Sequence, residues 1–153
     1  MELLKDIQLK DFQSSLSLRQ ENGSQKIFCA VRRKFLVLQP EELIRQSWIQ
    51  YLIRNHNLSP NLMQVEKQII VLGKRRRFDL LIYNIDHKPT VLFEFKGFNI
   101  KVDNSTFEQI ALYNLSLKIP KLVISNGIEH FGAVINFNTE NYQLTEKVAD
   151  ILS

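Results

Sequence analysis

The stretch FDLLIYNIDHKPTVLFEFK, residues 78–96, contains two apolar runs on either side of a short polar segment. Both runs are rich in β-branched and aromatic residues and have the length of a strand, so we expect strands over residues 78–83 and 90–95. The polar residues 84–89 predict the turn between them. Because the runs are apolar on both faces, the stretch predicts an antiparallel hairpin in the centre of a larger sheet.

Three charged residues interrupt this apolar hairpin. A turn centred on the polar segment places Asp79 directly opposite Glu94 if there is no bulge, with Cβ atoms roughly 4.5–5.5 Å apart. Lys96 lies two residues beyond Glu94 and shares its face of the strand. Carboxylates that close repel unless a cation lies between them, and Mg²⁺ prefers carboxylate oxygens. The set predicts a Mg²⁺ site in which Lys96 holds a phosphate or helps to deprotonate a water. The alternative is an acid–lysine pair on a solvent-facing strand.

The positive charge of the chain is concentrated in two clusters. The 153 residues carry a formal net charge of +4, and the clusters are residues 32–34 and 74–77. Arg75, Arg76 and Arg77 directly precede the strand that carries Asp79, so they predict contacts with a nucleic-acid backbone. A solvated turn is an equally good explanation of these arginines.

Other features limit the class of protein. Cys29 is the only cysteine, which excludes an internal disulfide and a cysteine-based zinc site. Residues 1–10 lack the apolar segment of a signal peptide, and no apolar run approaches the ~18 residues that a membrane helix needs. We therefore expect a soluble, cytoplasmic protein that does not associate with membranes.

The rest of the sequence predicts helices that cover a mixed sheet. Pro40, Glu41 and Glu42 are typical of a helix start, and residues 103–105 offer N-caps for a second helix over residues 106–117. We expect an α/β fold. Its predicted parts are an N-terminal extension (1–25), one domain (26–153), two β-like runs within 26–38, strands at 62–72, 121–125 and 130–137, and a polar tail from Thr139 that ends in a short helix. The first helix should bury one face, formed by Ile44, Trp48, Tyr51 and Leu52.

Four polar residues outside the hairpin are candidates for the same site. Gln109 and Tyr113 are four residues apart, so they share one face of the second helix and can both donate hydrogen bonds. An ordinary polar flank of that helix is the alternative. Glu42 is either an outer metal ligand or an acid favoured by the helix dipole, and Glu66 is a weaker candidate.

Together these residues resemble the PD-(D/E)XK nuclease superfamily, and more closely the N-terminal nuclease domain of type I restriction enzyme R subunits. The resemblance covers residues 26–137. It rests on residues 40–46 (PEELIRQ), 65–69 (VEKQI), 77–79 (RFD), 94–96 (EFK), 107–114 (FEQIALYN) and 125–127 (SNG). Phe78 departs from the pattern, because many members have proline before the aspartate.

The resemblance implies a restriction-endonuclease-like fold of a helix, three antiparallel strands, a helix and further strands. It implies that Asp79 and Glu94 hold Mg²⁺, with Mn²⁺ as an alternative ion, and that Lys96 completes the site. Gln109 and Tyr113 match a Gln-x-x-x-Tyr element of the subfamily, and Glu42 matches a helix acid that supports the metal in some members. The implied substrate is DNA, and the implied partners are the translocase, methylation and specificity components of a restriction complex.

Two functions other than a DNA endonuclease remain open from the residues. A binding module would hold nucleic acid or protein and keep the acidic pair as structure. An assembly domain would dock the rest of a restriction complex and have no affinity for nucleic acid. An R subunit continues into a helicase-like translocase, so the sequence leaves open whether it is a whole protein or a fragment.

Overall fold

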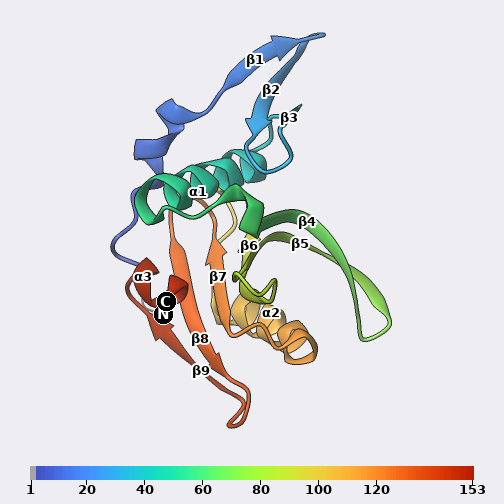
Figure 1. The fold of residues 1–153 in the computed structure, drawn as a ribbon, viewed down its shortest axis with the longest axis vertical. Helices are drawn as coiled ribbons and strands as arrows, with labels where there is room; N and C mark the ends of the chain where they lie inside the picture. The colour runs from blue at the N-terminus through green and yellow to red at the C-terminus, as the bar shows by residue number, and fades with distance from the viewer. Residues whose placement is uncertain (1–2) are drawn as a thin grey trace.

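Two sheets lie on opposite sides of one long helix in the computed structural model, which describes residues 3–153 (Figure 1). The larger sheet has six strands in the order β4-β5-β6-β7-β8-β9, and the smaller has three in the order β1-β2-β3. The elements, in chain order, are the 3₁₀ helix η1 (Leu9–Ser15), β1 (Leu18–Glu21), β2 (Ser24–Cys29), β3 (Lys34–Val37), α1 (Pro40–His56), the 3₁₀ helix η2 (Pro60–Leu62), β4 (Met63–Val71), β5 (Lys74–Tyr83), β6 (Pro89–Phe95), α2 (Asn104–Leu117), β7 (Lys121–Ser125), β8 (His130–Asn136), β9 (Asn141–Thr145) and α3 (Val148–Leu152).

The predicted central hairpin is confirmed as β5 and β6. They pair antiparallel, with Leu80 opposite Phe93, which is the register expected from the turn. The register shifts between Ile82 and Tyr83, at the end of the strand nearest the turn, so the shift does not reach the charged end. β6 pairs parallel with β7 and the other neighbouring strands pair antiparallel, which makes the sheet mixed.

Apolar side chains from both faces of the large sheet form two cores. One core joins Leu80 and Phe93 to Trp48 of α1, whose indole ring packs edge-on against Phe93 with 5.2 Å between centroids. The other joins Leu81 and Leu92 to residues of α2. The alternation along β5 and β6 therefore directs successive side chains to α1 and to α2, as the double-sided apolar pattern predicted.

Helix α1 is buried on more sides than a single apolar face would require. Ile44, Trp48, Tyr51 and Leu52 are buried as predicted, and so are Arg45, Gln46, Ser47 and Ile49. The small sheet accounts for the difference, since Cys29 of β2 reaches the same core and the Ala30 amide donates to Gln46 Oε1. The predicted β-like runs of residues 26–38 are thus strands β2 and β3 of a hairpin.

Both ends of the chain contribute more structure than their polar composition suggests. Leu4, Ile7 and Leu9 are buried in the α1 core, and the Leu4 amide donates to the His130 carbonyl. Strands β1 and β9 were not predicted, whereas the short C-terminal helix α3 is confirmed. The boundary at residue 25 stays a prediction. Within residues 3–153, every helix is too short or too polar to cross a membrane.

The order of the main elements matches the restriction-endonuclease-like arrangement. Helix α1 precedes the antiparallel strands β4, β5 and β6, helix α2 follows them, and β7, β8 and β9 complete the sheet. The α/β fold class with a mixed sheet and flanking helices is therefore confirmed.

Candidate active site

The candidate site lies where strand β5 separates from β6. Their ladder ends at Leu80 and Phe93, and the next residue of β5, Asp79, turns its side chain towards β6. Asp79 Oδ2 accepts a hydrogen bond from the Phe95 amide at 2.7 Å. The carboxylate thus takes the place of a backbone carbonyl of the neighbouring strand, and the two backbones diverge beyond it.

A matching irregularity in β4 lies beside Asp79. Val65 pairs with Leu80 and belongs to the α1 core, whereas two residues away Lys67 pairs with Phe78, which belongs to the α2 core. Glu66, between Val65 and Lys67, has a φ of +51°, a left-handed conformation that is uncommon for a non-glycine residue. Both strands therefore change faces here, and the predicted direct opposition of Asp79 and Glu94 in a regular ladder is wrong.

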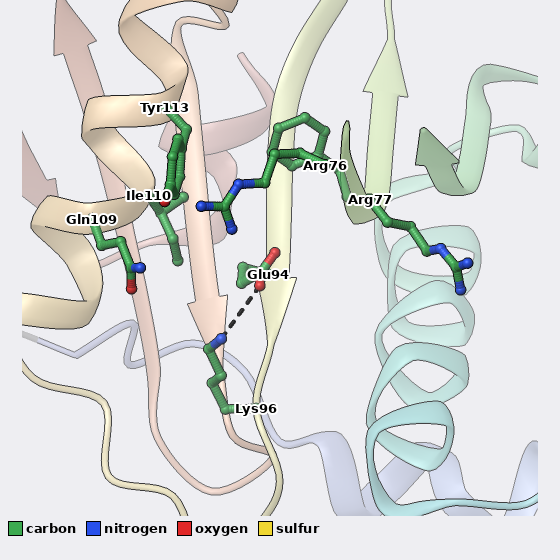
Figure 2. A pocket seen from close by; sticks show the side chains of 8 residues that line it. Arg76, Arg77, Glu94, Lys96, Gln109, Ile110 and Tyr113 are labelled. Carbon is green, nitrogen blue, oxygen red and sulfur yellow. Dashed lines mark hydrogen bonds and ion pairs between the residues drawn. The ribbon is translucent and has the colours of Figure 1, made fainter. Parts of the chain in front are cut away.

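A cavity of about 130 Å³ opens at this separation, between β6 and α2 (Figure 2). Glu94 and Lys96 of β6 line it, with Lys96 Nζ 3.3 Å from Glu94 Oε1. Gln109 and Tyr113 of α2 line it from the other side. Residues of a strand and of a helix that were predicted separately from the sequence therefore line the same cavity. Three residues of β5 (Arg76, Arg77 and Phe78) and Ile110 of α2 complete the lining.

Burial makes Glu94 a weak acid. Loss of solvation, followed by repulsion from the Asp79 carboxylate, raises the pKa of Glu94 from 4.5 to about 7, although Lys96 acts in the opposite direction. Burial also raises the pKa of Asp79, while the Phe95 amide and Arg45 lower it. Ionisation of both acids at once is therefore unfavourable in the absence of a cation. A carboxyl group with a pKa near 7 is typical of functional sites.

Asp79 does not line this cavity but a second one, at the N-terminal end of α1, with residues from β3, α1, β4 and β5. Arg45 Nη2 lies 4.0 Å from Asp79 Oδ1, Arg45 Nε lies 3.1 Å from Glu42 Oε2, and Arg45 Nη1 lies 3.5 Å from Glu66 Oε1. Arg32 adds an ion pair to Glu66 at 2.8 Å. Arg45 therefore links three acids of three different elements.

The two remaining acid candidates lie in this arginine network. Glu42 is buried, which raises its pKa even though Arg45 lowers it. Burial alone would raise the pKa of Glu66, but Arg45 and Arg32 bring it below its usual value. Arg45 and Arg32 were missed in the sequence. The i,i+3 spacing of Glu42 and Arg45 was the one available signal for Arg45.

The side chains of Asp79 and Glu94 are chemically suited to bind a divalent cation. Both offer carboxylate oxygens, which hard cations such as Mg²⁺ prefer, and both have a raised pKa that a bound cation would lower. Among residues 3–153, no group of three or more His, Cys, Asp or Glu side chains is arranged to hold a metal ion. A cation here would therefore need backbone oxygens, waters or a phosphate as further ligands.

The three consecutive arginines have different surroundings. Arg76 lies over the Tyr113 ring, with 3.6 Å from its guanidinium carbon to the ring centroid. Arg77 points away from that cavity towards α1 (Figure 2), and its Nη1 is 3.8 Å from Glu66 Oε1. Arg75 is exposed. The alternation of side chains along β5 separates Arg76 from its two neighbours.

Comparison with known proteins identifies the family. A search of curated proteins found no match. The family model of the type I restriction enzyme R protein N terminus matches residues 40–151, which run from the start of α1 into α3. The match includes Glu42, Asp79, Glu94, Lys96, Gln109 and Tyr113, and leaves out the small sheet. The chain therefore belongs to the family of type I restriction enzyme R protein N-terminal domains.

Proposed function

We propose that this domain is a metal-dependent endonuclease that hydrolyses phosphodiester bonds of DNA. The observation that carries the proposal is the cavity in which Glu94, Lys96, Gln109 and Tyr113 meet. Asp79 accepts a hydrogen bond from the amide of Phe95, the residue between Glu94 and Lys96. Family membership supports a restriction enzyme context. Acidic, cationic and hydrogen-bonding groups around one small space suit a charged phosphate better than an apolar ligand.

Asp79 and Glu94 are the residues that would hold Mg²⁺, with Mn²⁺ as the alternative ion. When bound, such an ion makes water a better nucleophile and neutralises charge on a phosphate. Glu42 stays a predicted outer ligand, and its ion pair with Arg45 at 3.1 Å would have to open first.

The remaining cavity residues would act on the phosphate and the water. Lys96, whose Nζ lies 3.3 Å from Glu94 Oε1, would hold a phosphate oxygen or help to deprotonate the attacking water. Gln109 and Tyr113 would donate hydrogen bonds to phosphate oxygens. The water oxygen adds to phosphorus, a phosphorus–oxygen bond to one sugar breaks, and the sugar oxygen gains a proton. Arg75, Arg76 and Arg77 would contact the nucleic-acid backbone.

The test combines metal binding with cleavage. Mg²⁺ and Mn²⁺ are titrated by calorimetry into the parent chain and Glu94→Ala, and the same samples are assayed for plasmid nicking. Glu108→Ala is the matched control, because Glu108 is an exposed acid of α2 next to Gln109. Loss of binding and nicking in Glu94→Ala alone supports the proposal. Binding without nicking in the parent assigns cleavage to a larger complex, and no binding in any variant overturns the metal site.

A catalytically silent binding or assembly module is the second candidate. The observation that favours it is that each acid already has a cation of the chain beside it, Lys96 for Glu94 and Arg45 for Asp79. Salt-sensitive DNA binding without metal binding would support a nucleic-acid module. Family membership also makes the translocase, methylation and specificity components of a restriction complex the proposed partners, and the cytoplasm the proposed location.

A further inference from the structure

Strands β4 and β5 continue past the candidate site as a two-stranded arm, defined here as residues 67–78. Four consecutive pairs, from Gln68–Arg77 to Val71–Lys74, hold the arm together, and Leu72 and Gly73 form its tip. Figure 1 shows the arm curving away from the other strands of the sheet. Both of its edges therefore lack a partner strand, because β4 is the edge strand of the sheet and β6 pairs only with residues 80–83 of β5.

The two faces of the arm have different neighbours. Ile69, Val71 and Phe78 pack into the α2 core, and Arg76, opposite Ile69, stacks on Tyr113. These residues form the inner face. Cross-strand partners share a face, so the outer face consists of Gln68 with Arg77 and Ile70 with Arg75.

The charge of the arm is all of one sign. It contains five cationic residues and no aspartate or glutamate, whereas the whole chain has a net charge of only +4. Four of the five are exposed, and the fifth, Arg76, is half-buried. A polyanion is the partner that fits this charge. The cationic residues are Lys67, Lys74, Arg75, Arg76 and Arg77.

Two large aliphatic side chains lie among these charges. Ile70 and Leu72 are each 71% exposed, and Leu72 has a φ of +51° next to Gly73 at +75°. Asparagine is favoured over leucine in such a left-handed turn conformation. The backbone conformation therefore does not explain why a leucine occupies position 72. Apolar side chains flanked by arginines suit the edges of bases, where thymine methyl groups offer an apolar contact.

We propose that the outer face and tip of the arm bind in the major groove of double-stranded DNA. A two-stranded β-ribbon fits that groove. Arg75 and Arg77 would contact phosphates or base edges, and Ile70 and Leu72 would contact the bases. The inference rests on the proposed function for its substrate class, and Arg77 of the outer face lies beside the second cavity, which Asp79 borders.

The test is duplex binding by the full chain, measured by fluorescence anisotropy with a labelled 20-base-pair DNA in EDTA. The double variant Ile70→Thr/Leu72→Asn removes the aliphatic groups and keeps residues suited to a strand and to a left-handed turn. It is expected to bind at least fivefold more weakly, with an unchanged salt dependence. Ile85→Asn is the matched control, because Ile85 is an 84% exposed aliphatic residue at the β5–β6 turn, and it should bind like the parent.

Charge and strand preference are tested separately. Arg75→Gln is expected to reduce the slope of log affinity against log salt by about 1. Parent-like binding by the double variant, or equally tight binding of the single strand, would overturn the groove proposal. Plasmid nicking by the parent keeps the two proposals apart. If the parent nicks plasmid and the double variant binds DNA like the parent, only the proposal for the arm is refuted. If DNA binding depends on the arm but the chain binds no metal, only the nuclease proposal is refuted.

Discussion

Glu94→Gln is predicted to stabilise the metal-free protein at alkaline pH. Glu94 has a pKa of about 7 in the folded chain against a reference of 4.5, so its ionised form is disfavoured by folding. The difference of roughly 2.5 pKa units corresponds to about 3 kcal/mol, since one unit is worth ~1.36 kcal/mol. Glutamine carries no charge at any pH and should be free of this penalty.

The direction in which the free energy of unfolding changes with pH follows from the protons that each state binds. Between pH 4.5 and 7 the folded state holds the Glu94 proton more often than the unfolded state does, so the free energy of unfolding falls as pH rises through this window. Above pH 7 both states are ionised and the penalty is complete. The parent should therefore lose up to about 3 kcal/mol between pH 4.5 and 8 relative to Glu94→Gln.

Urea unfolding in EDTA at pH 5, 6, 7 and 8 measures this difference. Glu108→Gln, which removes an exposed acid of α2, should follow the parent curve. Asp79→Asn should narrow the difference, because the charge of Asp79 is the second cause of the raised pKa of Glu94. Mg²⁺ at pH 8 should stabilise the parent and leave Glu94→Gln unchanged. Parallel pH curves for the parent and Glu94→Gln would refute the reasoning.

Two further predictions concern the acids and their arginine. Below pH 7, the Mg²⁺ affinity measured by calorimetry should increase by up to about tenfold for each pH unit, because a proton on Glu94 competes with the ion. An affinity independent of pH would count against Glu94 as a ligand. Arg45→Met leaves Glu42 buried without its ion-pair partner, so urea unfolding should show a loss of about 3–5 kcal/mol. Arg54→Met, at an exposed position of the same helix, should change stability by less than ~0.5 kcal/mol.

The features that the sequence predicted well depend on neighbours along the chain. The β5–β6 hairpin is a local unit, and its turn set the register up to Leu80 and Phe93. Helix α2 has its cap at Asp103, whose Oδ1 accepts from the Thr106 amide at 3.0 Å. Gln109 and Tyr113 follow one turn apart on that helix and both reach the cavity, so helical spacing sufficed to place them together.

The features that were missed depend on distant segments. Strands β1 and β9 are short and mostly exposed edge strands. β1 has no apolar alternation, and the alternation in β9 is limited to Tyr142 and Leu144, which is too short to identify a strand. Arg45 is buried because Glu66 of β4 and Asp79 of β5 both approach it, and no local pattern in α1 reports those partners. The separation of β5 from β6 at Asp79 lies beside the change of faces in the neighbouring strand β4.

The conformation of Glu66 connects the candidate site with the arm. A left-handed non-glycine residue is disfavoured by roughly 1–2 kcal/mol, and here the ion pairs of Glu66 with Arg32 and Arg45 offset that cost. Val65 and Leu80 on one side of Glu66 pack into the α1 core, whereas Ile69 and Phe78 on the other side pack into the α2 core. Beyond this change of faces, Arg76 lies over the Tyr113 ring on the inner face of the arm, and Arg75 and Arg77 lie on its outer face. The change of faces at Glu66, whose carboxylate has ion pairs with Arg32, Arg45 and Arg77, therefore determines which cations the arm exposes.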